Sequence, residues 1–278
     1  MRNLPVDFSF RDEFLHEVSE DFIHGSFATT VALGNGFTAT HAVGAITTAD
    51  RTVLFPPRMN IAWTAADNEF NSYVTTNAVF IFHEGEPIRA KGRLTPGAAA
   101  QLPWELNLFL GCMEDMDTAT EMQDAGAGPR ADDDMFGFFT VENGGAVYPN
   151  SEDLWHCVSS FGALQQITVL DAATVLNGPE VRVNTGAGAG DGIEHEFVAE
   201  WVPTNVVPGV AGAAPTLFDA EVRFLVDGLL VAKHLMRGGF QITAATAAPM
   251  NFGIVGRNIT DIADIDVDFL KCTQGRAR

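Results

Sequence analysis

Hydrophobic and polar residues alternate in short runs along most of this chain, and Gly, Pro, Asn and Asp separate the runs. A period of two is typical of strands with one buried face, and no helical period is sustained after residue 25. The pattern predicts strands at 52–55, 77–83, 104–110, 136–141, 164–170, 193–202, 219–226, 229–235 and 265–271. Strands that follow one another without helices between them indicate a β-sandwich or barrel rather than βαβ units.

The strongest local signal is the dipeptide Asp227-Gly228, which stands between two alternating runs. Asp-Gly favours the two-residue type I′ turn, because both central residues of that turn need positive φ. The sequence therefore predicts a hairpin that places Val222, Phe224 and Val226 on one face.

Near the N-terminus, hydrophobic side chains recur at every fourth residue, at Phe14, Val18 and Phe22. Acidic residues fill the positions between them, and Gly25 stands where a helix C-cap is expected. This spacing predicts a short amphipathic helix over residues 11–24, and a short strand over 6–10 precedes it. We expect residues 1–26 to form an N-terminal arm and residues 27–278 to form a single sandwich domain.

Composition narrows the range of partners. The chain has 278 residues, 46% of them hydrophobic, and 36 Asp and Glu against 16 Lys and Arg give a net charge of -20. Such an excess of acid argues against binding to nucleic acid, whose phosphates need clustered Lys and Arg. No signal peptide and no apolar stretch of membrane-spanning length appear, so we expect a protein made soluble in a cytoplasm, without membrane contact.

The three cysteines, Cys112, Cys157 and Cys272, are too few for a disulfide framework in a chain of this length. We expect buried thiols that pack as small hydrophobic groups, although two of the three could pair.

Six stretches resemble, in their order, strands of the concanavalin A-like lectin and glucanase family, which includes laminin-G-like modules. They are 105–111, 135–141, 194–200, 221–231, 249–253 and 266–271. The most specific of them is the hairpin around Val226-Asp227-Gly228, which marks the fold rather than a function. The resemblance implies an all-β jelly-roll β-sandwich, an architecture that also occurs in structural proteins of phage virions.

Three aspartates, Asp264, Asp266 and Asp268, alternate with hydrophobic residues and therefore share one face of a strand. Neighbouring carboxylates of such a row start ~6.6 Å apart, so a solvated face explains them without a metal ion. The resemblance implies another use, a structural Ca²⁺ that ties the last strand to the N-terminal segment through Asp268 and Asp12. The acidic loop at Asp132 and Asp134 is the rival calcium site, and Ca²⁺ is the one candidate cofactor.

Catalytic patterns are missing from the sequence. Glucanases of the family place their carboxylates in an E-x-D-x-x-E run, and the acids between Glu114 and Glu121 do not have that spacing. Ser159 stands near His156 without the G-x-S-x-G elbow of a serine hydrolase. We therefore expect no enzymatic activity. Trp104 and Trp155 are candidates to stack on a sugar ring, and the alternative is that they belong to the core.

These observations favour a structural protein on the exterior of a virus particle, specifically a capsid decoration or cement protein. Its expected partners are other virion proteins such as the major capsid protein, and further copies of itself on the particle. The face formed by Phe14, Val18 and Phe22 would dock on a neighbour, or else pack on its own sandwich. The alternative function is a glycan-binding adhesion module of a tail or fibre, and a glycoside hydrolase is disfavoured.

Overall fold

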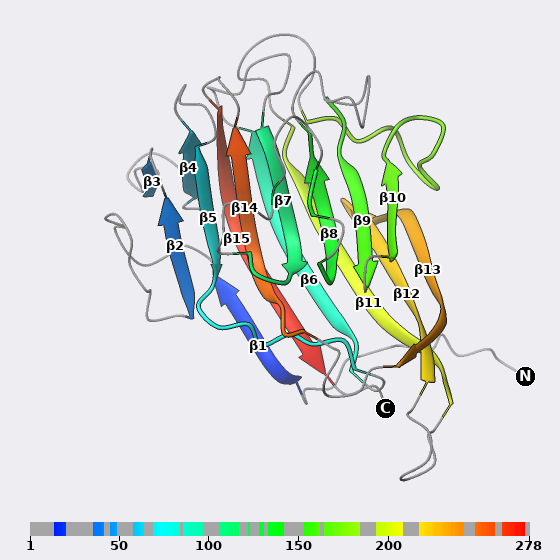
Figure 1. Ribbon diagram of the computed structural model, residues 1–278. Helices are drawn as coiled ribbons and strands as arrows, with labels where there is room; N and C mark the ends of the chain where they lie inside the picture. The colour runs from blue at the N-terminus through cyan, green and yellow to red at the C-terminus, as the bar shows by residue number, and fades with distance from the viewer. Residues whose placement is uncertain are drawn as a thin grey trace, which may run out of the picture.

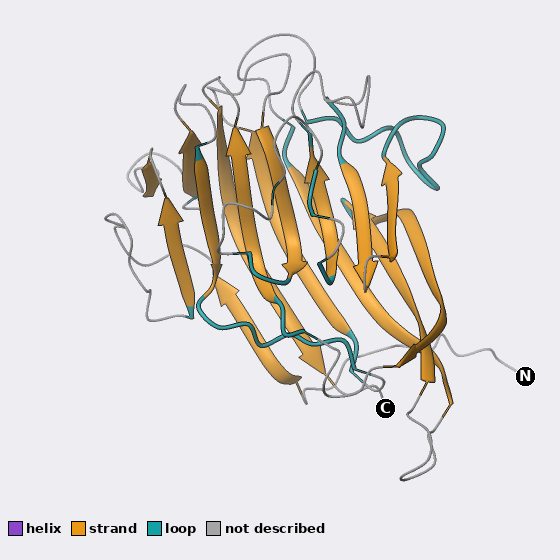
Figure 2. Ribbon diagram, viewed as in Figure 1, coloured by secondary structure: helices purple, strands orange, loops and turns teal. Residues whose placement is uncertain are grey.

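Two antiparallel sheets pack face to face in the computed structural model (Figures 1 and 2). The structure describes residues 14–20, 36–41, 45–48, 58–63, 69–83, 86–96, 106–116, 122, 128–130, 133–141, 153–161, 164–183, 193–207, 217–241, 248–258 and 263–275. In this part of the chain all regular elements are strands, and no helix occurs that is long and apolar enough to cross a membrane.

Sheet A has eight strands. In spatial order they are β13 (Leu229–Gln241), β12 (Leu217–Val226), β11 (His195–Val207), β6 (Ile88–Pro96), β15 (Ala263–Gly275), β4 (Met59–Trp63) and β3 (Ala45–Thr48), and β1 (Phe14–Glu20) also pairs with β15.

Sheet B has seven strands. In spatial order they are β10 (Leu164–Val169), β9 (His156–Phe161), β8 (Met135–Thr140), β7 (Leu106–Met113), β14 (Asn251–Asn258), β5 (Phe70–Thr75) and β2 (Phe37–His41). The connections cross between the sheets, as when β14 of sheet B leads into β15 of sheet A. The expected all-β sandwich of two antiparallel sheets is confirmed.

Between the two sheets lies a core rich in aromatic residues. Trp63 and Trp201 are almost completely buried there, and the Trp201 ring stacks on Phe82 with 4.8 Å between ring centroids. All three cysteines are buried and free, as the sequence predicts. Cys112 of sheet B faces Cys272 of sheet A across the core, with 3.6 Å between the two Sγ atoms.

At two places in sheet B, paired strands approach each other so closely that the position must be glycine. A Cβ atom at Gly111 would lie 2.3 Å from the carbonyl oxygen of Phe136, and one at Gly253 would lie 2.2 Å from that of Tyr73. Both distances are far below van der Waals contact, so the strands can approach this closely only because these positions lack a side chain.

The predicted hairpin is confirmed. Asp227 and Gly228 have φ of 51° and 79°, as a type I′ turn requires, and they join β12 to β13. Val222, Phe224 and Val226 share the buried face of β12.

The predicted N-terminal helix is wrong, because residues 14–20 form strand β1. β1 pairs antiparallel with β15, with Val18 opposite Cys272. A spacing of four residues places side chains on one face of a helix, but four is also a multiple of the strand period of two. The open edge of β15 supplies backbone partners for a strand, and this tertiary contact decides between the two structures.

Most of the other predicted strands are confirmed to within a few residues, from 104–110 to 265–271. The segment 77–83 is an exception: it is extended but makes only isolated bridges, at Phe80 and His83. The predicted strands at 6–10 and 52–55 lie outside the described residues.

Candidate functional site

The face of sheet B that points away from sheet A is apolar and buried. A second hydrophobic cluster covers it, which we call the sealed cluster: Phe70, Val74, Phe109, Met113, Met116, Met122, Met135, Phe139, Val141, Val158 and Val255. None of these side chains is more than 4% exposed. Strands β5, β7 and β8 are therefore buried on both faces, and the sequences of β7 and β8 are correspondingly almost continuous hydrophobic runs rather than alternating ones.

Part of the cover comes from the chain that follows β7. Met116 and Met122 lie in the segment expected to be an acidic loop, yet both are completely buried in the sealed cluster. Met122 is held by its carbonyl oxygen, which accepts a hydrogen bond from Arg257 of β14 at 3.3 Å. Flexible methionine side chains suit this role because they fill irregular gaps.

A histidine is buried at the margin of the sealed cluster. The His156 ring stacks on Phe139 with 4.7 Å between centroids. Burial disfavours the charged imidazolium and lowers the pKa of His156 to about 4, although backbone hydrogen bonds at Leu154 and Phe139 oppose the shift. At neutral pH the ring is uncharged.

The outer face of sheet A is the opposite in character. Strand β6 turns Arg89, Lys91 and Arg93 outward, beside Glu196 and Glu200 of β11, and we call these five residues the charged ladder. The Arg89–Glu200 pair is 3.2 Å apart, and Lys91 and Arg93 each lie 3.0 Å from a carboxylate oxygen of Glu196. These ion pairs link the two central strands of the face.

Further ion pairs continue across the sheet on both sides of the ladder. Lys233 of β13 and Arg223 both lie 2.5 Å from Glu221 of β12, and Lys271 of β15 lies 2.9 Å from Glu17 of β1. All three lysines of the chain thus lie on this one face. The face is locally balanced in charge, so the excess acid of the chain is concentrated elsewhere.

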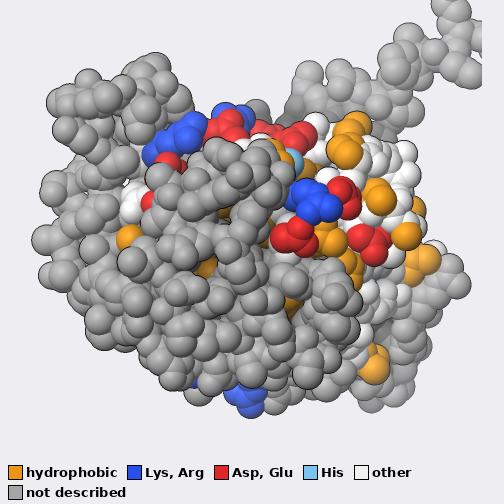
Figure 3. Space-filling model, turned by 90° about the horizontal axis from the view of Figure 1, so that it is seen from above, with side chains coloured by type: hydrophobic (Ala, Val, Ile, Leu, Met, Phe, Trp, Pro, Cys, Tyr) orange, Lys and Arg blue, Asp and Glu red, His pale blue; other side chains and the backbone are white. Residues whose placement is uncertain are grey.

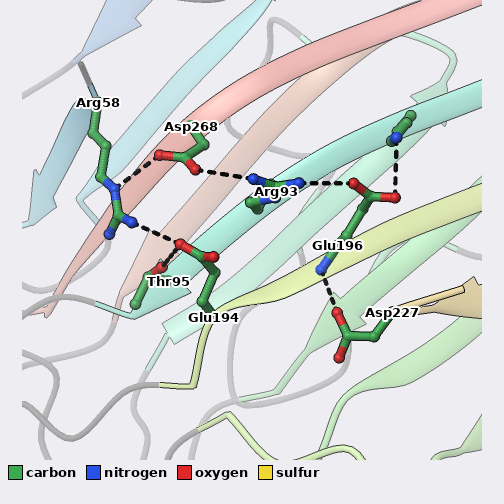
Figure 4. A network of polar contacts seen from close by, with 8 residues as sticks. Arg58, Arg93, Thr95, Glu194, Glu196, Asp227 and Asp268 are labelled. Atoms are coloured by element: carbon green, nitrogen blue, oxygen red, sulfur yellow. Dashed lines mark hydrogen bonds and ion pairs between the residues drawn. The ribbon is translucent and has the colours of Figure 1, made fainter. Parts of the chain in front are cut away.

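A β-bulge brings Asp268 into this network. Val267 pairs with Leu94 and Phe269 with Arg93, which leaves Asp268 as the extra residue of β15. Its carboxylate is almost buried and lies 2.8 Å from Arg58 and 3.6 Å from Arg93 (Figure 4). The Phe269 ring lies beneath Lys91 and Arg93, with 5.1 and 5.2 Å from ring centroid to cation.

At the Arg93 end of the charged ladder is an open hollow of about 400 Å³, lined by Arg93, Glu194, Glu196 and Asp227. Each of its three carboxylates is oriented by a neighbour, as Figure 4 shows. Glu194 lies 2.7 Å from Arg58, and Thr95 donates a hydrogen bond to it at 3.5 Å.

Asp227 of the hairpin turn reaches back to β11. One of its oxygens accepts a hydrogen bond from the Glu196 backbone N–H at 2.9 Å, and the other lies 2.7 Å from Nδ1 of His195. The turn that the sequence marks so clearly therefore also fixes one wall of the hollow.

The charges of the hollow stabilise one another. Burial alone would raise the pKa of Glu196, but hydrogen bonds from Lys91 and Arg93 outweigh it and lower that pKa below its ordinary value. The hydrogen bond to Glu196 raises the pKa of Arg93 in turn. The hollow thus presents fixed carboxylates and a fixed guanidinium, a donor and acceptor set that suits hydroxyl groups.

The predicted metal residues are not brought together in the described structure. Asp268 is paired with two arginines, and the Asn60 amide bridges Asp264 and Asp266 with hydrogen bonds of 3.0 and 2.9 Å. Asp134 is buried beside the start of β8, whereas Asp12 and Asp132 lie outside the described residues. Within the described ranges no group of three or more His, Cys, Asp or Glu side chains could hold a metal ion.

The predicted glycan-stacking role of Trp155 is wrong, since its ring is buried in the core against Phe197, with 4.4 Å between centroids. Trp104 lies outside the described residues. Of the predicted docking residues, Val18 packs against the core from β1, while Phe22 and the side chain of Phe14 lie outside what the structure describes.

Sequence reasoning missed the residues that form the hollow. The signal was the alternation of Arg89, Lys91 and Arg93, which predicts a basic row on one strand face. A second signal was the close spacing of Glu194 and Glu196. Neither pattern reveals that the two rows are neighbours, because the strands are about a hundred residues apart in the chain.

Ser159 does bond to a histidine, but not to the one near it in sequence. His234 of β13 lies 2.8 Å from the Ser159 hydroxyl and 3.0 Å from that of Thr168. Burial lowers the pKa of His234 to about 4. Ser159 is completely buried, and the two ring nitrogens of His234 bond to hydroxyl groups of sheet B, so this cluster joins the two sheets.

No protein-family model matches the chain, and no curated protein matches its sequence. Solved structures with a similar arrangement include an endo-1,3-β-glucanase from Streptomyces sioyaensis, with 14% identity over 94% of this chain and 95% of the other, and a TM-score of 0.46. A seed lectin from Lotus tetragonolobus is 9% identical over 90% and 97% of the two chains, with a TM-score of 0.44. A carbohydrate esterase from Shiga toxin-encoding bacteriophage phi24B is 11% identical over 88% and 91%, with a TM-score of 0.40.

Proposed function

We propose that this chain is a non-enzymatic structural protein that decorates the exterior of a virus particle and binds the major capsid protein. The observation that supports this most directly is the sealed cluster, because it turns the outer face of sheet B into a second core. A fold that packs one sheet face as a second core gains rigidity, which suits a scaffold.

The outer face of sheet A is the proposed attachment surface. Its charges are held in register by cross-strand pairs, so they meet a partner already oriented and lose little side-chain entropy on binding. Oriented charges on a binding surface favour specificity and a fast association rate.

The first experiment is density-gradient fractionation of the native lysate with immunodetection of this chain. Banding with particles at a fixed stoichiometry is the expected result, and recovery only in the soluble fractions would contradict the proposal.

The attachment surface is then tested with two matched variants in rebinding to particles stripped of this chain. Arg89→Ala removes a half-exposed, ion-paired arginine from the ladder, and Arg182→Ala removes a similar one that pairs with Asp153 and Glu180 instead. We expect weaker rebinding for Arg89→Ala alone. Equal binding by both variants would move the attachment surface elsewhere.

A second candidate function is glycan binding, and the hollow beside the hairpin favours it. Fixed carboxylates next to a guanidinium can accept hydrogen bonds from vicinal hydroxyls and donate to them. A glycan array would identify a ligand, and Glu194→Gln should then reduce binding while Glu200→Gln, outside the hollow, should not. An array without any signal would contradict glycan binding, and the scaffold function would then be the only one of the two proposals left.

A further inference from the structure

Four leucines are unusually exposed for this chain. Among the described residues the large hydrophobic side chains that stand out in solvent are Leu164, Leu176, Leu229 and Leu235, at 69%, 57%, 48% and 42% exposure. Single exposed leucines are common on protein surfaces and need no explanation. These four need one, because they lie on one side of the sandwich.

That side is the edge where β10 ends sheet B and β13 ends sheet A (Figure 1). Gln166, two residues after Leu164, donates a hydrogen bond to the Leu235 carbonyl at 3.0 Å. Farther along, the Leu176 N–H donates to the Val231 carbonyl at 2.9 Å, and Gly178 packs against Leu229. We call the four side chains the leucine edge, and Figure 3 shows hydrophobic side chains gathered on this side of the molecule.

Addition of a further strand is hindered at this edge. Side-chain amides occupy backbone carbonyls of β13: Gln166 of β10 bonds to that of Leu235, and Asn177, in the irregular segment after β10, bonds to that of Leu230 at 2.7 Å. Capping of this kind protects an edge strand from pairing with another chain. These carbonyls are not free for a partner strand, so the exposed leucine side chains are the groups that this part of the edge offers to a partner.

The four leucines expose apolar area on the order of a few hundred Å², within the ~300–600 Å² of the largest patch on a typical monomer, which is often functional. A standard interface buries ~800 Å² on each partner, of which an apolar centre is only a part. The leucine edge thus has the size of the centre of a standard interface, with room for a polar rim.

Ion pairs border this edge, with three basic residues for three acidic ones. Arg182 pairs with Asp153 and with Glu180, and Lys233 and Arg223 pair with Glu221. Two copies that each carry a charge of -20 repel each other over most of their surfaces, so they can approach most closely where the local charge is balanced.

We propose that the leucine edge is a homodimer interface, in which a second copy of this chain packs the same edge against it about a two-fold axis. Such an interface is self-complementary, because the same leucine edge of both copies forms its two sides. This contact is centred on β10 and β13, whereas the charged ladder lies on β6 and β11, and it does not depend on attachment to a particle.

The proposal makes a distinctive prediction about salt. Salt screens the repulsion between two highly acidic copies, whereas it leaves burial of leucine intact. Dimerisation through the leucine edge should therefore strengthen as ionic strength rises, while association through the charged ladder should weaken.

Sedimentation equilibrium of the full chain, from low salt to 1 M NaCl, tests this. We expect a dimer whose association constant increases with salt, and a decrease of about tenfold or more for Leu176→Asp and for Leu164→Asp. Both residues are exposed, so circular dichroism and thermal unfolding should be unchanged. Asn77→Asp adds the same charge at an exposed position near the end of β5, far from the leucine edge, and should dimerise almost as the wild type does.

Two results would overturn the proposal. One is a chain that stays monomeric at every salt concentration up to the solubility limit. The other is a dimer that weakens with salt and tolerates both leucine substitutions.

Discussion

The two outer faces of this sandwich belong to sheets of similar size and the same antiparallel kind, yet they differ completely. The outer face of sheet A is a charged surface whose ion pairs link neighbouring strands. The outer face of sheet B is covered by the sealed cluster and behaves as a second core. The fold thus supplies two faces and leaves the sequence to decide which one meets solvent.

The difference can be read in the period of the strands. β6 alternates strictly between buried residues and outward polar ones, with a burial pattern that changes at every position. β7 and β8 are buried at every position. Strict alternation marks a strand with one wet face, and an unbroken hydrophobic run marks a strand covered on both sides.

The largest expected effect comes from removing an aromatic ring on each face. Phe109→Ala empties part of the sealed cluster and should lower the free energy of unfolding by about 3–5 kcal/mol. Phe269→Ala makes the same chemical change on the outer face of sheet A, where it removes cation–π contacts and should cost about 1 kcal/mol. Urea unfolding measures both, and equal losses would mean that the faces are not different in burial.

The next effect is a dependence on pH that originates in the sealed cluster. The pKa of His156 is about 4 in the folded chain against about 6.5 when unfolded, so the neutral ring contributes stability above pH 6.5. This contribution, roughly 3 kcal/mol, is lost as the pH falls from about 6.5 through about 4. Urea unfolding at pH 7 and pH 5 should show a smaller loss for His156→Gln than for the wild type, and identical losses would place the ring in solvent.

A smaller effect is expected at the bulge in β15. Asp268→Asn keeps the shape of a nearly buried side chain but removes the charge between Arg58 and Arg93, and should cost about 1–3 kcal/mol. Asp266→Asn, on the same strand but more exposed and bonded to Asn60, is the control and should cost less than about 1 kcal/mol. If the control is the more damaging change, Asp268 does not anchor the network.

The smallest effect belongs to the ladder itself. Lys91→Ala breaks one cross-strand ion pair that is about one-third exposed, and should cost less than about 1 kcal/mol. The cost should shrink further in 1 M NaCl, because salt screens exposed pairs. Thermal unfolding at two salt concentrations measures it, and a loss as large as that of Phe109→Ala would contradict the contrast between the faces.

Local sequence was enough to predict the all-β class, most strands after residue 100 and the turn at Asp227-Gly228. Each depends on neighbouring residues only, through the strand period or through the φ angles that a turn requires. The burial of the three cysteines was predicted from their small number and from the hydrophobic character of a free thiol.

What the tertiary structure decided depends on residues far apart in the chain. The spacing of Phe14 and Val18 fits a helix and a strand equally well, and only the edge of β15 selects the strand. The alternation of Asp264, Asp266 and Asp268 suggests equivalent carboxylates, until a bulge and two arginines from other strands single out Asp268.

The hollow and the sealed cluster also depend on residues that are far apart in the chain. Arg93 and Glu196 meet because β6 and β11 pair, and Met122 is buried because its segment packs over a sheet formed elsewhere in the chain. Sequence patterns report the period of a single strand, whereas register and coverage depend on which strands become neighbours. That choice is made by the whole core as it packs, and no local stretch contains it.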